Sequence, residues 1–391
     1  MVSYPKDWET VELNKKYKRV SGTPITAEMM ANIACAGGNI AVYAGGNTKI
    51  KAKSDCIQNS NIINDEVVIV QSRGIIDFIF SDKPCTFKNE FWGYIGDKNN
   101  SVKFLYYLLK NNVTYFRTAG EGRSSFSQIT KSVTENYSIP NIKITEQQAI
   151  VDALTAFDTH INNLAKLIEK KKMIRDGAVE DLVSGKRRLA GFSGKWEYKH
   201  VSEVTREIIT GGTPSTNVEN YWDGEIPWLA STEIHQKKIN KATRYITKQG
   251  LHNSSAKMAL KQSVLIALAG QGKTRGRAAI LEKNMAINQS LAALISDNNV
   301  DFRFIYYAME ISYDALRELS SGDGGRGGLN KKLIRDFIIA IPTSLLEQQA
   351  IADILTAMDK EISDLEEEKE KYIALKAGAM DDLLTGKIRL V

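Results

Sequence analysis

The sequence predicts an α/β (α+β) fold in which two globular domains are joined by two long antiparallel helices that form a coiled coil, with an internal pseudo-two-fold repeat. Three observations predict this. A helical block occurs twice, both copies have a heptad-like apolar spacing, and the rest of the chain contains short β-like runs between glycine-rich loops. With 391 residues, 43% of them hydrophobic, the chain can bury more than one core.

The duplicated block is 45 residues long. Residues 146–190 (EQQAIVDALT…) align without a gap with residues 347–391 (EQQAIADILT…), and 22 of the 45 positions are identical. Weaker echoes connect SGTP at 21–24 with GGTP at 211–214, and FLYY at 104–107 with FIYY at 304–307. The order is therefore globular (1–145), helical (146–190), globular (191–346), helical (347–391).

Apolar residues in each block recur at alternating steps of four and three, the 3.5-residue period of a left-handed coiled-coil seam. They are Ile150, Leu154, Phe157, Ile161, Leu164 and Ile168 in the first block, and Ile351, Leu355, Met358, Ile362 and Leu365 in the second. In the second block Lys369 interrupts the seam before Tyr372 resumes it. We expect one helix per block, ending near Gly185 and Gly386, since glycine closes helices in the left-handed conformation.

A helix of about 39 residues is about 58 Å long and cannot bury such a seam by itself. The obvious partner is the other copy. An antiparallel pair is favoured, because the domain between the helices then needs only neighbouring termini. The alternative is that the two blocks are ordinary amphipathic helices, each packed on a separate core.

Both globular regions have mixed α/β patterning. Strands are expected at Glu66–Val70 and Ser263–Leu268, and helices around Val102–Asn111 and Phe302–Ser312. Loops that combine glycine with arginine or lysine recur at matching places: 71–74 and 270–277, then 120–125 and 322–328. Such loops suit close approach to phosphates and base edges, although each could also be a solvated turn.

The segment LIALAGQGKTRG (265–276) resembles a phosphate-binding P-loop only in part. The pattern G-x-x-x-x-G-K-[ST] requires glycine where Ala267 stands, and the matching loop of the first half has no Lys-Thr. The downstream residues RGRAAILEKN indicate a turn into another strand rather than a helix. A basic loop at a nucleic-acid surface fits both halves better than a nucleotide site does.

Composition and motifs argue against catalysis in this chain. The seven prolines are isolated, so the Pro-Pro motif of amino-methyltransferases is absent, and there is no G-x-S-x-G. The four histidines are far apart, which disfavours a metal site. We therefore expect no catalytic residue, no cofactor and no metal in this chain.

Net charge, cysteine spacing and the first residues indicate where the protein acts and what it can bind. A net charge of +6, from 52 Lys+Arg and 46 Asp+Glu, permits contact with a polyanion. The three cysteines form no Cys-x-x-Cys pair, and the first residues lack the apolar core of a signal peptide. We expect a cytoplasmic protein without a membrane segment.

The sequence resembles the specificity (S) subunit of type I restriction-modification systems over nearly its whole length. The resemblance rests on TGGTPSTNVENYWDGEIPWLASTEI (210–234), GLHNSSAKM (250–258), NQSL (288–291), the paired Ile-Pro…Glu-Gln-Gln-Ala-Ile helix entrances, and the repeated helix ends 182–189 and 383–390. Singly these pieces are common, whereas their combination is specific.

The resemblance implies two target-recognition domains, each reading one half of a bipartite, asymmetric double-stranded DNA target. It also implies a chain that is not an enzyme. This chain would dock two adenine-methyltransferase (M) subunits, which bind S-adenosylmethionine, and through them motor-nuclease (R) subunits, which consume ATP. Two alternatives from other classes are a coiled-coil scaffold without a nucleic-acid role and a P-loop nucleotide-binding protein.

Candidate DNA contacts differ between the two domains. The first domain lacks the Trp-Leu-Ala-Ser-Thr-Glu motif, so its candidates rest on loop chemistry alone: Gly45, Gly46, Asn47, Lys49, Arg73, Arg123 and Ser124. In the second domain, Glu233 could accept from cytosine, while lysines and arginines could donate to guanine or phosphate. The candidates there are Ser231, Thr232, Glu233, Lys273, Thr274, Arg275 and Arg326.

The helices are the expected partner surface and spacer. Outward polar residues at 170–172 and 366–371 are candidates for docking, or simply a solvated face. A spacer of about 58 Å fixes the gap between half-sites at roughly one and a half DNA turns from centre to centre.

Changing the length of the spacer should therefore change the DNA target. We predict that adding or removing a turn in both helices lengthens or shortens the gap and leaves the bases of each half-site unaltered. Mapping methylated sites for each length variant measures the gap. An unchanged gap would show that the helices do not set it.

Overall fold

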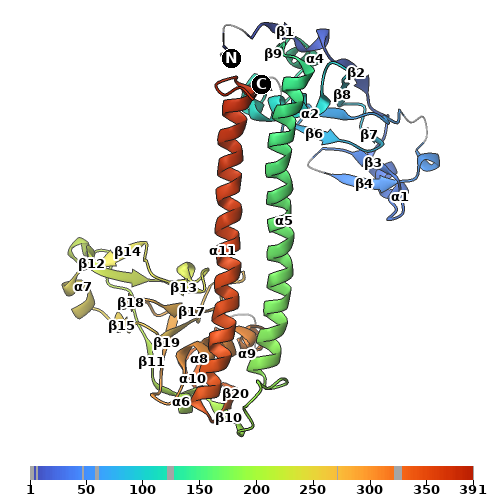
Figure 1. The fold of residues 1–391 in the computed structure, drawn as a ribbon. Helices are drawn as coiled ribbons and strands as arrows, with labels where there is room; N and C mark the ends of the chain where they lie inside the picture. Colours follow the sequence, from blue (N-terminus) through green and yellow to red (C-terminus); the bar gives the residue numbers. More distant parts are fainter. Residues whose placement is uncertain are drawn as a thin grey trace. The chain divides into compact units, whose positions relative to one another are not determined.

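The structure is a computed structural model that describes residues 4–5, 8–45, 48–57, 61–120, 127–270, 272–320 and 328–390. The chain divides into two compact units: Met1–Ala165 with Glu367–Val391, and Lys166–Glu366. Each unit combines one globular part with segments of two long helices, α5 and α11 (Figure 1). None of the described helices is long and apolar enough to cross a membrane.

The duplicated blocks form helices α5 (Ile144–Val183) and α11 (Leu345–Leu384), each of 40 residues. Both end as the sequence predicts, because the glycines that follow, Gly185 and Gly386, have φ angles of 72° and 75°. Within each unit, segments of the two helices contact each other. Partner numbers on α11 fall as those on α5 rise, so the segments run antiparallel.

The apolar seam is buried in two ways. Leu164 and Ile168 on α5, and Ile362 on α11, are buried along the helices. The beginning of each helix instead joins a globular core: Leu154 packs in the core of the first unit and Leu355 in that of the second. Within each unit, then, segments of the two helices contact each other and also anchor a globular core, while coiled-coil packing of the seam stays a prediction.

The first unit has three small sheets, with strand orders β1-β9, β2-β8-β5-β6 and β4-β3-β7. The predicted strand and helix are present as β5 and α2. The elements are β1 (Thr10–Glu12), η1 (Leu13–Lys15), β2 (Lys18–Ser21), α1 (Ala27–Ile33), β3 (Ile40–Tyr43), β4 (Lys49–Ala52), η2 (Ser54–Cys56), β5 (Val67–Gln71), β6 (Asp77–Ser81), β7 (Cys85–Phe87), β8 (Trp92–Ile95), α2 (Val102–Asn111), α3 (Val113–Gly120), α4 (Lys131–Glu135) and β9 (Ser138–Pro140).

The second unit has sheets of order β10-β20, β11-β19-β16-β17-β13 and β14-β12-β18-β15. The predicted strand and helix are β16 and α8. The elements are β10 (Trp196–His200), α6 (Val201–Val204), β11 (Thr205–Thr210), η3 (Glu219–Tyr221), β12 (Trp222–Leu229), η4 (Ser231–Glu233), β13 (Lys238–Ile239), β14 (Arg244–Ile246), α7 (Lys248–His252), β15 (Lys257–Ala259), β16 (Val264–Ala267), β17 (Ala278–Leu281), β18 (Met285–Ile287), β19 (Leu291–Ser296), α8 (Phe302–Ile311), α9 (Tyr313–Leu319), α10 (Lys331–Asp336) and β20 (Ile338–Pro342).

The internal repeat extends through the globular parts. The order β2-β8-β5-β6 matches β11-β19-β16-β17, and β4-β3-β7 matches β14-β12-β18, strand for strand. The pair β1-β9 matches β10-β20. Among the strands that the structure describes, the second unit adds β13 and β15 at sheet edges. The fold is therefore duplicated even where the sequences of the two halves have diverged.

An aspartate near the start of each long helix connects that helix to the other helix and to a globular part. In the second unit, Asp359 of α11 accepts from Arg175 of α5 at 2.9 Å and from the hydroxyl of Tyr307 of α8 at 2.9 Å. In the first unit, Asp158 of α5 accepts from Lys376 of α11 at 2.6 Å and from Tyr107 of α2 at 2.6 Å. The two sites occupy equivalent positions of the repeat.

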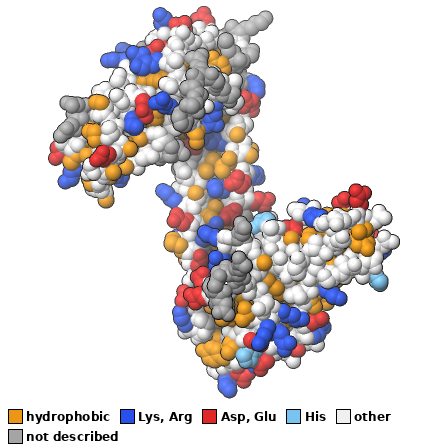
Figure 2. Space-filling view, turned by 180° about the vertical axis from the view of Figure 1, so that it is seen from behind, with side chains coloured by type: hydrophobic (Ala, Val, Ile, Leu, Met, Phe, Trp, Pro, Cys, Tyr) orange, Lys and Arg blue, Asp and Glu red, His pale blue; other side chains and the backbone are white. Residues whose placement is uncertain are grey.

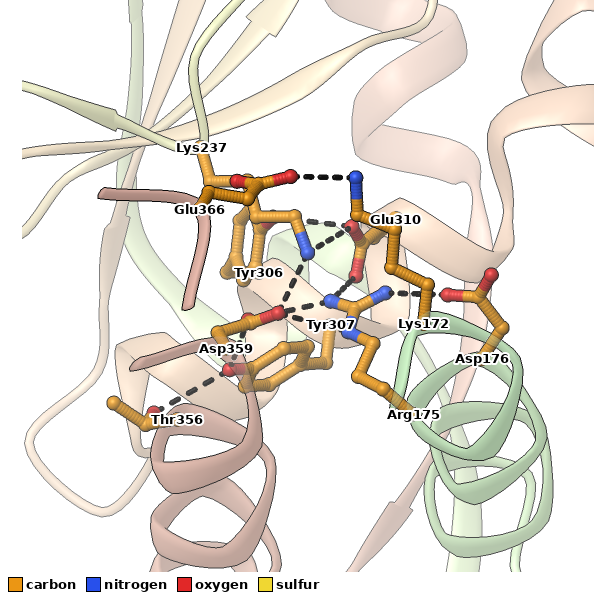
Figure 3. Close-up of polar contacts among 10 residues, drawn as sticks. All are labelled: Lys172, Arg175, Asp176, Lys237, Tyr306, Tyr307, Glu310, Thr356, Asp359 and Glu366. Carbon is orange, nitrogen blue, oxygen red and sulfur yellow. Dashed lines mark hydrogen bonds and ion pairs between the residues drawn. The ribbon is translucent and has the colours of Figure 1, made fainter. Parts of the chain in front are cut away.

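The second of these sites is a buried charge cluster, shown in Figure 3. The Arg175 side chain, 7% exposed, lies between Asp359 and Glu310, and Lys237 adds a second cation 2.6 Å from Asp359. Burial would raise the pKa of Asp359, but the hydrogen bonds and charges of Lys237 and Arg175 outweigh it, so the pKa lies below its ordinary value. The ionised form of Asp359 is therefore the stable one.

A second repeated contact joins the residues that follow one long helix to the first turn of the other. Glu347, at the start of α11, accepts two hydrogen bonds from Arg188, at 2.7 and 2.9 Å, and the Arg188 guanidinium lies 5.7 Å from the centre of the Trp196 ring. In the first unit, Glu146 and Arg389 form the same pair, with Arg389 over Trp8. The residues after each helix thus return to the start of the other helix.

We predict that Arg175→Met lowers the free energy of unfolding by about 2 kcal/mol, because it leaves two half-buried carboxylates, Asp359 and Glu310, with a single lysine. The matched control is Lys171→Met, which removes a partly exposed ion pair with Glu361 on the same helices and should cost about 1 kcal/mol or less. Urea unfolding followed by tryptophan fluorescence measures both. Equal losses would contradict a special role for the buried cluster.

Candidate nucleic-acid interface

In each unit, one turn forms hydrogen bonds with segments next to the candidate loops. In the second unit this turn, 288–291, connects β18 to β19. Asn288 N donates to Leu229 O at the end of β12 (3.0 Å), and Leu268 N, after β16, donates to Ser290 O (2.8 Å). Thr213 Oγ1 donates to Gln289 Oε1 at 2.9 Å. The turn, which contains NQSL, therefore contacts the GGTP segment, the end of β12 before Ala-Ser-Thr-Glu, and the end of β16 before the Gly-Lys-Thr loop, where strands of two sheets end.

The first unit repeats this arrangement with a different sequence. Its turn, 88–91, connects β7 to β8. Lys88 N donates to Tyr43 O at the end of β3 (3.1 Å), and Thr23 N donates to Phe87 O (2.7 Å). Ser72 Oγ, after β5, donates to Glu90 O at 3.0 Å. We call these two equivalent regions the recognition edges.

A shared glycine makes the close packing of each edge possible. A Cβ atom on Gly211 would overlap the carbonyl oxygen of Ile287, and one on Gly22 would overlap that of Phe87. Gly22 and Gly211 thus meet the same steric requirement in the two units. The echo between SGTP and GGTP aligns Gly22 with Gly212 instead, so the structural match is offset by one residue from the sequence match.

The three candidates that follow β12 differ in their surroundings. Thr232 is exposed, whereas Ser231 is buried at 6% exposure. Glu233 accepts from the amide of Ala230 at 3.2 Å, and from the amide and hydroxyl of Thr243 at 2.7 and 2.9 Å. Both of its carboxylate oxygens thus hold the loop together, and contact between Glu233 and a base stays a prediction.

The candidates between β16 and β17 lie in a loop held by α9. The hydroxyl of Tyr313 donates to Lys273 O at 2.9 Å, and Arg275 donates to the Ser320 hydroxyl at 3.3 Å. The Lys273 side chain is exposed, while Thr274 and Arg275 are partly buried. The segment after this loop is strand β17, as predicted, and not the phosphate-capping helix of a P-loop.

The described candidates of the first unit lie near its own recognition edge. Gly45 is exposed in the connection between β3 and β4, Lys49 is exposed at the start of β4, and Arg73 is exposed after β5. The amide of Gly74 donates to Ser127 O at 2.9 Å. The candidates Gly46, Asn47, Arg123, Ser124 and Arg326 lie outside the described residues.

Sequence reasoning missed one residue of this surface, Arg244. It follows Thr243 directly and begins strand β14, where it is paired in register with Trp228. No motif marks it, because its neighbours in space come from β12. The only sequence signal was the nearby tryptophan-containing motif, which indicates an aromatic surface without naming what lies on it.

Polar groups elsewhere have a structural role. A groove of about 1280 Å³ in the second unit is lined by the buried Arg175–Asp359 cluster and by lysines of the β13 edge. Along the helical segments of both units, basic and acidic side chains are interspersed (Figure 2). Among the described residues, no group of histidine, cysteine, aspartate and glutamate side chains could hold a metal ion.

We predict that Gly211→Ala destabilises the second unit by about 2 kcal/mol, because the added methyl group displaces the β18–β19 turn. Gly177→Ala, at an open position on α5 where nothing lies within 4 Å of the new Cβ, should instead stabilise the protein by about 0.5–1 kcal/mol. Thermal unfolding of both variants measures whether the melting temperature falls for Gly211→Ala and rises for Gly177→Ala. A neutral Gly211→Ala would refute the steric requirement.

Comparisons with known proteins agree with this architecture. The family model "Type I restriction modification DNA specificity domain" matches residues 5–171 and 193–375. The Escherichia coli EcoR124I/EcoR124II specificity subunit is 25% identical over 296 residues, covering 72% of this chain and 69% of that protein. The MjaVIII specificity subunit of Methanocaldococcus jannaschii is 24% identical over 310 residues, covering 73% and 70%.

Solved structures show the same fold. The type I restriction-modification S subunit from M. genitalium matches with a TM-score of 0.68 at 18% identity, covering 98% of this chain and 99% of that one. A chain from a structure of type I restriction-modification complex assembly matches with a TM-score of 0.56 at 17% identity, covering 99% and 100%. Because the family model matches both halves of the repeat, this chain belongs to the type I restriction-modification DNA specificity family.

Proposed function

We propose that this chain is the DNA-sequence specificity subunit of a type I restriction-modification complex. The domains at 1–145 and 191–346 each read one half of a bipartite double-stranded DNA target. One observation carries the proposal: in both units a turn at the equivalent place contacts the ends of equivalent strands, although the side chains on the two recognition edges differ.

The difference between the edges predicts an asymmetric target. The first edge presents Lys49 and Arg73, whereas the second presents Thr232 and Lys273. Because sequence is read by side-chain contacts to base edges, two such surfaces select different half-sites. The same scaffold thus carries two specificities.

The blocks 146–190 and 347–391 form a coiled coil that sets the gap between half-sites and docks two M subunits. Repetition supports this proposal: a duplicated chain offers two equivalent surfaces to two identical partners. Part of the proposed docking surface is already paired, because Lys171 and Lys172 form ion pairs with Glu361 and Glu366. The polar residues outside these pairs are the better docking candidates.

The chemistry of the complex belongs to its partners. In this proposal the chain is not an enzyme and holds no cofactor, while S-adenosylmethionine is bound by the M subunits and ATP by the R subunits. The absence of a G-x-S-x-G motif and of the Pro-Pro motif of amino-methyltransferases in the sequence supports a role without catalysis.

The test is to coexpress the chain with its M subunit and map N6-methyladenine across the genome by single-molecule sequencing. We expect a single split motif with a fixed gap and two unlike halves. A stable complex that methylates no defined motif would instead identify the chain as a docking scaffold without a role in DNA recognition.

A further inference from the structure

The structure assigns a further specificity-determining residue: we propose that Arg244 reads a guanine in the half-site of the second domain. This inference rests on the proposed function and names one contact within it. The Arg244 side chain is exposed, and its guanidinium is stacked on tryptophan. It forms no hydrogen bond or ion pair with the described part of the chain.

The stack holds the guanidinium in place. Its central carbon lies 3.7 Å from the centre of the Trp222 ring and 5.5 Å from that of Trp228, and the two rings pack edge to face at 5.3 Å. The rings are themselves anchored: Trp222 Nε1 donates to Ser215 O and Trp228 Nε1 to Gly212 O, both at 3.1 Å. Strands β12 and β14, which carry these residues, lie side by side (Figure 1).

Other aromatic-stacked arginines of the described chain use their donors internally. Arg175 lies over Tyr307 and donates to Asp359, and Arg188 lies over Trp196 and donates to Glu347. Arg317 lies over Tyr313 and donates to Gly272 O. Among the described residues, Arg244 has the stack without such an acceptor. Its donors are therefore ready for an acceptor outside the chain.

The position of Arg244 indicates that DNA supplies the acceptor for its guanidinium donors. Thr243, its neighbour in sequence, donates to Glu233, which places Arg244 beside the recognition edge. Glu233 thus acts as a positioning residue for Arg244. A planar guanidinium in a fixed orientation matches the N7 and O6 acceptors of guanine, and stacking reduces the side-chain entropy lost on binding.

The first unit has a counterpart at the same place. Lys49, the first residue of β4, is paired in register with Tyr43 at the end of β3, and its amine lies 5.1 Å from the centre of that ring. Tyr43 is anchored as well, because its hydroxyl donates to Ser81 at 3.3 Å. In both units, then, the edge strand next to the recognition edge begins with a cation stacked on an anchored aromatic ring.

The experiment uses the complex of the whole chain with its M subunit and compares methylation selectivity at every base pair of the motif. For Arg244→Ala we expect a roughly ten- to hundred-fold loss of discrimination at one G·C pair of one half-site, with the other half-site and the gap unchanged. Arg244→Lys keeps the positive charge and an alkyl stem but lacks the planar guanidinium. It should also lower the discrimination at the same G·C pair.

Two controls separate the possible outcomes. Arg206→Ala removes an exposed arginine near the start of β11, at the end of that strand away from the GGTP segment, and should leave the motif unchanged. Lys49→Ala should weaken the opposite half-site. An unchanged motif in both Arg244 variants, a loss that is uniform over all sequences, or a half-site without guanine would overturn the proposal. A wild-type complex with no motif at all would instead refute the proposed function.

Discussion

The cross-helix contact of an aspartate with a cation and a tyrosine is the constraint on which the rest of each unit depends. It connects three elements that are distant in sequence: the start of one long helix, the later part of the other, and a helix of the globular part. A half-buried carboxylate with a partner on each side disfavours displacement, because the displaced group would lose its ion pair and its hydrogen bond together. Helix register and domain attachment are therefore fixed together.

The same contact explains how a divergent sequence keeps a duplicated fold. The helix blocks and their tyrosine partners are similar in the two halves because both must build this junction. The globular parts need to preserve only their strand order, the glycine beneath the turn and the backbone bonds of that turn. Exposed side chains on the recognition edges, such as Thr232, Lys273 and Arg73, contribute little to this framework, so they can vary and change specificity without loss of the fold.

The recognition edge shows how rigidity and variation are combined. Backbone hydrogen bonds hold the turn and its neighbours, while anchored aromatic rings orient the cations above them. A donor fixed before DNA arrives loses less entropy on binding, and it rejects an incorrect base more strongly than a mobile donor would. In this respect the exposed cations of the two edges differ from the charged pairs along the helices, which satisfy each other.

The sequence by itself determined the elements whose signal is local: the two duplicated helices, their terminal glycines, strands β5 and β16, helices α2 and α8, and the strand after Gly-Lys-Thr. Periodicity and capping act over a few residues, so they can be read without a structure. Only the tertiary structure decided which loops meet, because the turns at 88–91 and 288–291 gather segments from distant parts of the chain. For the same reason the bonding of Glu233 and the stacking of Arg244 were invisible in the sequence, since each depends on neighbours that only folding brings together.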